Sequence, residues 1–185
     1  MSGERGVLYV ATCATAAAPG IGTLIDLAQL SGWDCCLLAT PNAVNFLNLP
    51  ELERQTGHPV RHEYRRPDEV SPFPAADGVV VAGASFNTVN KLAAGIADTL
   101  VLSTVTEAMG AGLPVVVAPF CNEALAKHVA WRRSIDTLRE MGVAVLVGPG
   151  LYEPHTAVDS TEALRNYPWR TTLITVEEMT EARRR

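Results

Sequence analysis

The fold of this chain is decided by Val79-Val80-Val81-Ala82-Gly83-Ala84-Ser85-Phe86-Asn87-Thr88. The first four residues are apolar and mostly β-branched, which is typical of a buried strand. A turn with small polar side chains follows, and residues 89–97 then have helical character. A second apolar run, at residues 115–118, leads in the same way to Asn122. Because ligands bind at the carboxyl ends of strands in open α/β sheets, both endings predict a binding site.

Apolar strands alternate with helical segments on either side of this stretch. Besides 77–82 and 115–118, strands are predicted at 6–11, 34–39 and 143–147. Helices are predicted at 19–32, from Thr40 onward, at 124–141 and at 175–182, and residues 50–74 have the character of a loop-rich crossover. Strands that are apolar throughout indicate a parallel sheet covered on both faces. We therefore expect one α/β, Rossmann-like three-layer domain over residues 1–185, with an irregular flap or arm at about 148–170.

The composition restricts the class of partner. The chain has 185 residues, of which 48% are hydrophobic and 19% charged, and its net charge is −5. An acidic balance gives no support for nucleic-acid binding, which favours clustered positive charge. No apolar run reaches the roughly 18 residues that span a bilayer, and residues 1–5 lack a basic leader followed by an apolar signal segment. We expect a cytoplasmic protein with no nucleic-acid and no membrane partner.

The cysteines do not form a metal-binding pattern. They are Cys13, Cys35, Cys36 and Cys121, and their spacing matches no zinc or iron–sulfur framework. Cys35 and Cys36 fall on a predicted buried strand. Reduced thiols in the core, and no bound metal, are therefore expected.

Helix capping is the simpler explanation of a polar strand-to-helix turn. The side-chain oxygen of Ser85 or Asn122 can accept a hydrogen bond from a free N–H of the helix that follows. One such turn would be explained well by capping alone. Two of them, at strands that are apolar up to their ends, favour a ligand site.

Two of these segments carry a family resemblance. Residues 82–88 resemble the PASANT motif of the homo-oligomeric flavin-containing cysteine decarboxylases, and residues 119–125 resemble their Pro-x-Met-Asn-x-x-Met motif. The segment at 94–100 is similar to the part that links the two motifs, and the whole resemblance covers roughly residues 6–148. The family includes phosphopantothenoylcysteine decarboxylases and enzymes that decarboxylate a C-terminal cysteine of a peptide. The resemblance implies a flavodoxin-like flavoprotein that binds FMN.

The resemblance also implies which residues bind the cofactor. Thr15 stands where the family has its phosphate-binding serine, and a helix N-terminus there supplies free N–H groups and a partial positive charge. Thr40 stands where the family contacts the same phosphate. Phe46 matches an aromatic position against the flavin, although plain core packing is the alternative. Hydrogen bonds to the ring are expected from two polar groups: Ser85, Asn87 and Thr88, and Ser103, Thr104 and Thr106.

Other nucleotide cofactors fit the sequence less well. The first strand is not followed by Gly-x-Gly-x-x-Gly, and no acidic residue closes a dinucleotide-binding unit about 20 residues later. FMN is therefore favoured over NAD and FAD.

The resemblance assigns the catalytic roles to two asparagines. Asn122 matches the residue that binds the carboxylate lost as carbon dioxide, and an amide N–H₂ can bind a carboxylate without adding charge. Asn87 matches the asparagine of the PASANT motif. The substrate is then a peptide or small molecule with a terminal cysteine. The family also assembles as trimers, or as dodecamers built from trimers, so we expect a homotrimer or homododecamer.

The chain departs from the family at several positions. The family's catalytic histidine corresponds to Glu69, and the nearest histidines, His58 and His62, lie upstream. Cys121 replaces the methionine of the substrate motif. Residues 148–185 contain no cysteine, so the reducing step of the phosphopantothenoylcysteine enzymes is not expected, and an oxidative reaction would stop at the ene-thiol.

These departures leave three functions open. One is an FMN-dependent decarboxylase in which Glu69 or His62 serves as the base, or in which the base is dispensable. The second is an FMN-binding regulatory or scaffold protein without decarboxylase activity. Flavin prenylation is the third, and residues 117–120 do not resemble the charged segment of that sister family.

Overall fold

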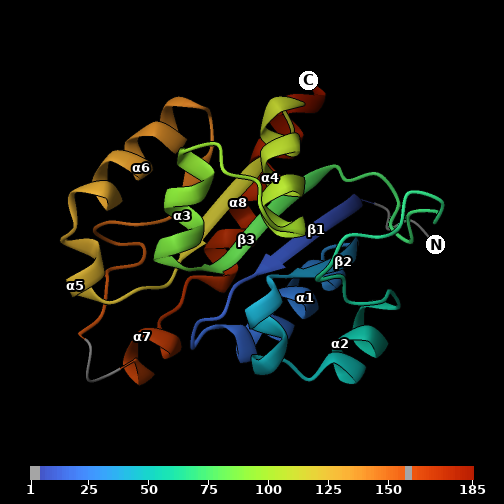
Figure 1. The fold of residues 1–185 in the computed structure, drawn as a ribbon, viewed down its shortest axis with the longest axis horizontal. Helices are drawn as coiled ribbons and strands as arrows, with labels where there is room; N and C mark the ends of the chain where they lie inside the picture. The colour runs from blue at the N-terminus through green and yellow to red at the C-terminus, as the bar shows by residue number, and fades with distance from the viewer. Residues whose placement is uncertain (1–4, 157–159) are drawn as a thin grey trace.

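Parallel strands form a single sheet in the computed structural model, which describes residues 5–156 and 160–185. Within these residues the sheet has five strands in the order β2-β1-β3-β4-β5, and every pair is parallel. Figure 1 shows the strands with helices in front of and behind them. The strands are β1 (Gly6–Thr12), β2 (Trp33–Ala39), β3 (Gly78–Ala84), β4 (Val115–Pro119) and β5 (Ala144–Val145).

The side chains of β3 show how the sheet is covered on both faces. Successive strand residues point to opposite faces, and Val79 and Val81 accordingly join one apolar cluster while Val80 and Ala82 join another. The first cluster is closed by α3 (Phe86–Ala93), α4 (Leu100–Gly110) and α6 (Val129–Glu140). The second is closed chiefly by α1 (Ile21–Leu30) and α8 (Trp169–Arg184). The expected α/β three-layer fold is therefore confirmed.

The strand order places a crevice at a defined point. From β1 the chain passes to β2 on one side and then returns to β3 on the other, so the direction of winding changes between β1 and β3. In doubly wound sheets ligands bind outside the carboxyl ends of the strands at such a switch point, and the order 2-1-3-4-5 is the flavodoxin-like one. The turns that leave β1 and β3 therefore meet where a ligand is expected.

Several helix predictions need correction. The crossover at 50–74 was expected to be mainly loop, but it begins inside a helix, α2 (Leu49–Thr56). Pro50 lies in the first turn of α2, where its missing N–H costs nothing, and Gly57 ends the helix with φ 73°. The short strand expected near Val60 is only an isolated bridge between Leu38 and Arg61.

The helix predicted over 124–141 is interrupted. It consists of α5 (Glu123–Ala126) and α6, and His128 forms the N-cap of α6 by accepting a bond from Ala130 N–H at 3.1 Å. The strand expected at 143–147 pairs over two residues only, in β5.

The C-terminal third is more regular than the sequence suggested. The irregular segment includes α7 (Thr161–Arg165), and the last helix, α8, begins at Trp169 rather than near residue 175. Buried side chains at Thr172, Leu173, Val176 and Thr180 hold one stripe of α8 against the sheet. This packing extends the helix beyond what its weak sequence pattern predicts.

The amino edge of the sheet, where β1 and β3 begin, is held by polar side chains. Asp77 accepts a hydrogen bond from Val7 N–H at 2.8 Å and lies 3.4 Å from the guanidinium of Arg184. Arg5 forms an ion pair with Glu181 at 2.9 Å. These contacts join the start of β1 to the end of α8. None of the helices in residues 5–156 and 160–185 is long and apolar enough to cross a membrane.

Candidate functional site

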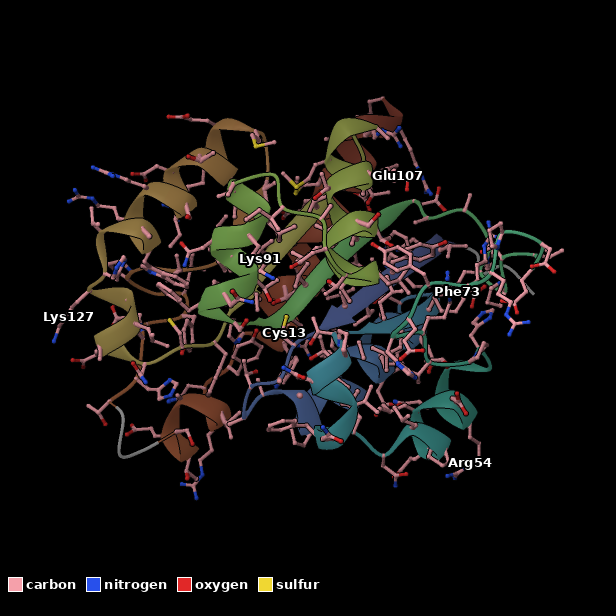
Figure 2. All side chains as sticks on the ribbon, in the orientation of Figure 1. Cys13, Arg54, Phe73, Lys91, Glu107 and Lys127 are labelled. Atoms are coloured by element: carbon pink, nitrogen blue, oxygen red, sulfur yellow. The ribbon has the colours of Figure 1, made fainter. Side chains whose placement is uncertain are left out.

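The turns after β1 and β3 bring three of the predicted cofactor-binding residues together. Thr15 Oγ1 donates a hydrogen bond to the Gly83 carbonyl at 3.1 Å. Thr88 Oγ1 lies 2.9 Å from Ser85 Oγ and 3.2 Å from the sulfur of Cys13. Figure 2 shows Cys13 at the end of the β1 arrow, next to the turn that leaves β3. Small hydroxyl groups therefore cluster at the switch point.

Helix capping accounts for part of this arrangement. Ser85 is the N-cap of α3, and its Oγ accepts a bond from Thr88 N–H at 3.2 Å. Asn87 lies exposed in the first turn of the same helix. The cap fixes the turn in one conformation, so capping and ligand binding are compatible for Ser85.

Gly83 makes close approach of the two turns possible. Its φ is +71°, a conformation that L side chains rarely adopt, and a Cβ there would lie 2.9 Å from Thr15 Oγ1 and 3.2 Å from the Ala17 Cβ. Beside it, Thr12 Oγ1 is buried and has no hydrogen-bond partner among the described residues. A glycine-lined cradle with neutral hydroxyl groups has the donors that a flavin phosphate and ring require, so these residues fit the cofactor that the motifs imply.

Thr40 is the N-cap of a short 3-10 helix, η2 (Pro41–Phe46), that follows β2, and Phe46 is the last residue of this helix. Thr40 N–H donates to the Thr12 carbonyl at 3.0 Å, so the end of β2 is tied to the end of β1. Phe46 is 45% exposed, which argues against the core-packing alternative. An aromatic ring left this exposed is available to a ligand or to another chain.

The second polar group lies within a helix. Ser103, Thr104 and Thr106 all lie within α4, which Thr99 caps by accepting a bond from Leu102 N–H at 3.3 Å. Val101 and Val105 of this helix are fully buried against the sheet. No helix was predicted over this segment. Contact of these three residues with a flavin stays a prediction.

Asn122 lies three residues after the end of β4 and caps α5. Its Oδ1 accepts a bond from Leu125 N–H at 3.0 Å. Capping uses the oxygen and leaves the amide N–H₂, for which no bond is found within the described residues. The amide therefore keeps the donors that a carboxylate requires.

Three side chains of the C-terminal segment complete this edge, and sequence reasoning missed them. Tyr167 accepts a bond from Gly83 N–H at 2.6 Å and donates to the Ala118 carbonyl at 2.6 Å. It thus fills the bulge in the register between β3 and β4. The Tyr152 hydroxyl bonds in the same way to the N–H and carbonyl of Cys121, at 3.0 and 2.8 Å. The Gly-, Pro- and Tyr-containing sequence indicated an arm but not its docking position.

His155 is the third of these side chains. Its backbone pairs with Asn122 in an isolated parallel bridge, and its carbonyl accepts a bond from Glu123 N–H at 2.8 Å. Its ring Nδ1 lies 2.9 Å from the Tyr152 hydroxyl, and the ring centroid is 4.6 Å from that of Phe120. A histidine therefore lies beside the predicted substrate asparagine.

Burial suppresses the ionisation of two tyrosines and one cysteine at this edge. Burial raises the pKa of both Tyr152 and Tyr167 far above the usual value of a phenol. It also raises the pKa of the Cys121 thiol to about 12. These two hydroxyl groups and this thiol therefore carry no negative charge at neutral pH.

The residues considered as substitutes for the family histidine lie elsewhere in this chain. Glu69 Oε2 accepts a bond from Arg66 N–H at 3.0 Å within its own loop. His58 Nε2 lies 2.8 Å from Asp34 Oδ1. The loop that follows ends beside the first half of β1, where Tyr9 donates to the Pro74 carbonyl at 2.6 Å. Phe73 of this loop lies toward the opposite end of the sheet from Cys13 (Figure 2). His62 and Glu69 line one surface pocket formed by residues 59–72, and no contact of either residue with Asn122 is found in the described part of the chain.

No group of three or more His, Cys, Asp or Glu residues that could hold a metal ion occurs in the parts of the chain that the structure describes.

Comparison with known proteins gives a family and a set of structural neighbours. The model of the family described as Flavoprotein matches residues 1–173. The Coenzyme A biosynthesis bifunctional protein CoaBC of Thermococcus kodakarensis is 28% identical over 159 residues, which are 80% of this chain. The match covers only 39% of that relative's length, so this chain spans less than half of the relative.

Solved structures agree with the fold. The FMN-dependent cysteine decarboxylase SpaF has a TM-score of 0.68 and 25% identity, with 91% of this chain and 95% of that chain covered. The cypemycin decarboxylase CypD superposes over 100% of this chain and 99% of its own, with a TM-score of 0.72 at 19% identity. The second likeness supports the fold alone.

Proposed function

Because the chain belongs to the Flavoprotein family, we propose that it binds FMN at the β1/β3 switch point and catalyses the oxidative decarboxylation of a cysteinyl carboxylate. The substrate is a peptide or a small molecule with a terminal cysteine. The observation that carries the proposal is the position of Asn122. It follows the strand next to the hydroxyl-lined turn of Ser85 and Thr88, and Phe120 N–H donates to the Ala84 carbonyl of that turn at 2.9 Å.

Different residues of the chain are proposed to bind the phosphate and the ring of FMN. Thr15, with free N–H groups at the start of the following helical segment, suits the phosphate. Ser85, Asn87 and Thr88 suit the polar edge of the ring, and the exposed ring of Phe46 suits its apolar face. When bound, FMN supplies an acceptor for two electrons from the cysteine side chain.

Asn122 holds the carboxylate that is lost. Its Oδ1 is fixed by the cap of α5, which orients the amide N–H₂ without further cost in side-chain entropy. A neutral donor binds a carboxylate without stabilising it as strongly as a cation would, so loss of carbon dioxide is less opposed. Positioning by Asn122 is therefore the main contribution of this side chain.

Assembly and location complete the proposal. Exposed apolar side chains at Phe46, Ile96, Leu125 and Val129 fit burial between copies of the chain, as a homotrimer or homododecamer requires. Four free and buried cysteines fit a reducing compartment such as the cytoplasm.

One observation favours a second candidate function. Glu69 stands at the position of the family's catalytic histidine, and its carboxylate is bonded within its own loop. A chain that binds FMN without a base near the substrate would act as a regulatory or scaffold protein. This alternative predicts bound flavin and no decarboxylation of any cysteinyl substrate.

Two measurements on the purified protein test the proposal. Flavin absorbance and the stoichiometry of released FMN test cofactor binding, and a protein that stays colourless after reconstitution would refute both candidate functions. Peptides ending in cysteine are then incubated with the FMN-loaded protein and followed by mass spectrometry for loss of carbon dioxide together with two hydrogens. Bound FMN without any modified peptide would favour the scaffold alternative.

A further inference from the structure

We propose that His155 is the catalytic residue that accepts the proton of the substrate thiol. This inference rests on the proposed function, because it assigns the proton transfer that the decarboxylation of a cysteinyl group requires. It names a residue from the C-terminal segment, which follows the matched motifs, in place of the residue at Glu69. The histidine is brought to the site by the fold and not by its position in the sequence.

The backbone places His155 next to Asn122. The two residues pair in a parallel bridge, in which paired side chains project to the same side. The bond from Glu123 N–H to the His155 carbonyl, at 2.8 Å, fixes this register. A substrate whose carboxylate is bound by the Asn122 amide therefore has its remaining cysteine atoms near the imidazole.

Phe120 and Tyr152 both contact the imidazole ring. It packs on Phe120 with a centroid separation of 4.6 Å, and its Nδ1 is 2.9 Å from the Tyr152 hydroxyl. Tyr152 is in turn fixed by the N–H and carbonyl of Cys121. Since Cys121 directly precedes Asn122, one short segment orients both the base and the carboxylate-binding amide. Tyr152 is a positioning residue in this arrangement.

A ligand has room to reach the imidazole. His155 and Tyr152 line a surface pocket of about 620 Å³ together with Glu123, Gly150 and residues of α7. The titratable neighbours in the described part of the chain are Tyr152 on the same segment, Glu123 on α5, and Glu153 and Glu162 on the pocket wall.

The step conserves atoms and charge. The S–H bond of the substrate cysteine breaks, an N–H bond forms on the imidazole, and the substrate becomes a thiolate. No electron leaves the substrate in this step. The thiolate is the form that gives up electrons readily to the flavin acceptor of the proposed function, because the negative charge on sulfur raises its donor strength.

The test compares His155→Gln with His62→Gln in the FMN-loaded protein. Glutamine cannot titrate, so His155→Gln should retain FMN yet lower kcat for a cysteine-ending peptide by about 100-fold or more. The decrease of kcat/KM at acidic pH that wild type shows should be absent from the His155→Gln variant. Affinity for the matching peptide that ends in serine, measured by calorimetry, should stay within threefold of wild type. His62→Gln should match wild type in all three measurements.

The remaining outcomes distinguish a failure of the proposed function from a failure of the His155 assignment alone. A wild-type protein that modifies no cysteinyl peptide would overturn the proposed function and this inference together. An active wild type with His155→Gln within threefold of it would overturn the inference alone, as would loss of FMN or of serine-peptide affinity in that variant. If His155→Gln does not fold, Tyr152→Phe provides the test, because it must shift the decrease of kcat/KM at acidic pH; an unshifted decrease would overturn the inference.

Discussion

The two edges of the same sheet are built from different chemistry. At the amino edge, Arg5, Asp77 and Arg184 form exposed or half-exposed ion pairs that tie the chain ends together. At the carboxyl edge, buried hydroxyl groups of Tyr152 and Tyr167 bond to the backbone beside the polar turns. Exposed ion pairs contribute little to stability, whereas buried backbone groups that lose a partner cost much more.

The ion pairs of the amino edge hold the chain ends together, whereas the carboxyl edge carries the groups that are proposed to bind ligands. Charges at the amino edge are paired with one another, and their contribution is to hold the start of β1 against the end of α8. The carboxyl edge instead holds neutral donors in fixed positions around a crevice. A neutral and preorganised surface can bind a phosphate, a flavin ring and a carboxylate together without strong repulsion from any of them. The predictions below test this contrast.

The largest effect is expected from charge placed at the carboxyl edge. Thr15→Asp puts a carboxylate where the phosphate is proposed to bind, so the variant should purify without FMN and resist reconstitution. Thr171→Asp adds the same charge to an exposed position of α8 and should retain the flavin of wild type. Equal flavin content in both variants, measured by absorbance, would reduce Thr15 to a structural contact with Gly83.

Alkaline pH should weaken the protein through its buried thiols. The pKa of Cys35, Cys36 and Cys121 is raised by burial from 9.0 to about 12. Between these values the unfolded chain releases protons that the folded chain keeps, so stability is fully present below pH 9 and is lost as the pH rises toward 12. Thermal unfolding should show this decline, and Cys121→Ala should make it shallower. A melting temperature that is constant to pH 11 would contradict the burial of these thiols.

A single hydroxyl of the carboxyl edge should matter more than a whole ion pair of the amino edge. Tyr167→Phe leaves the Gly83 N–H and the Ala118 carbonyl without their partner, and we expect a loss of about 2 kcal/mol in the free energy of unfolding. Tyr64→Phe is the matched control, since Tyr64 is exposed. Chemical denaturation measures both, and equal stability of the two variants would refute the bridging role of Tyr167.

The smallest effect is expected at the amino edge. Arg184→Ala removes the pair with Asp77 and should lower the free energy of unfolding by less than about 1 kcal/mol. Flavin content and turnover should not change, because the residue lies at the other end of the sheet. A loss of FMN in this variant would contradict the division between the two edges.

Local patterns in the sequence were sufficient for most of the sheet and for the capped turn after β3. The strand that contains Val79 to Ala82 and the capped turn at Ser85 depend on neighbours in sequence, and both were predicted. Helix α4 was not predicted, although Val101 and Val105 carry a helical apolar spacing.

The rest of the site depends on contacts that no local pattern reports. Tyr167 bonds to Gly83 across 84 residues, and Tyr152 bonds to Cys121 across 31. His155 reaches Asn122 only because this arm folds back over the end of β4. An arm that pairs with a strand end has no periodicity of its own, so its docking position requires the fold.

The most direct measurement concerns the amide of Asn122. Asn122→Asp keeps an N-cap residue for α5 but replaces the amide N–H₂ by a carboxylate, and Asn122→Ala removes the amide altogether. Both variants and the wild type are loaded with FMN and incubated with a peptide that ends in cysteine, and the products are weighed by mass spectrometry. We expect wild type to remove carbon dioxide from the peptide, and both variants to retain FMN and leave the peptide unchanged. Turnover by either variant at the wild-type rate would contradict the assignment of this edge as a decarboxylase site.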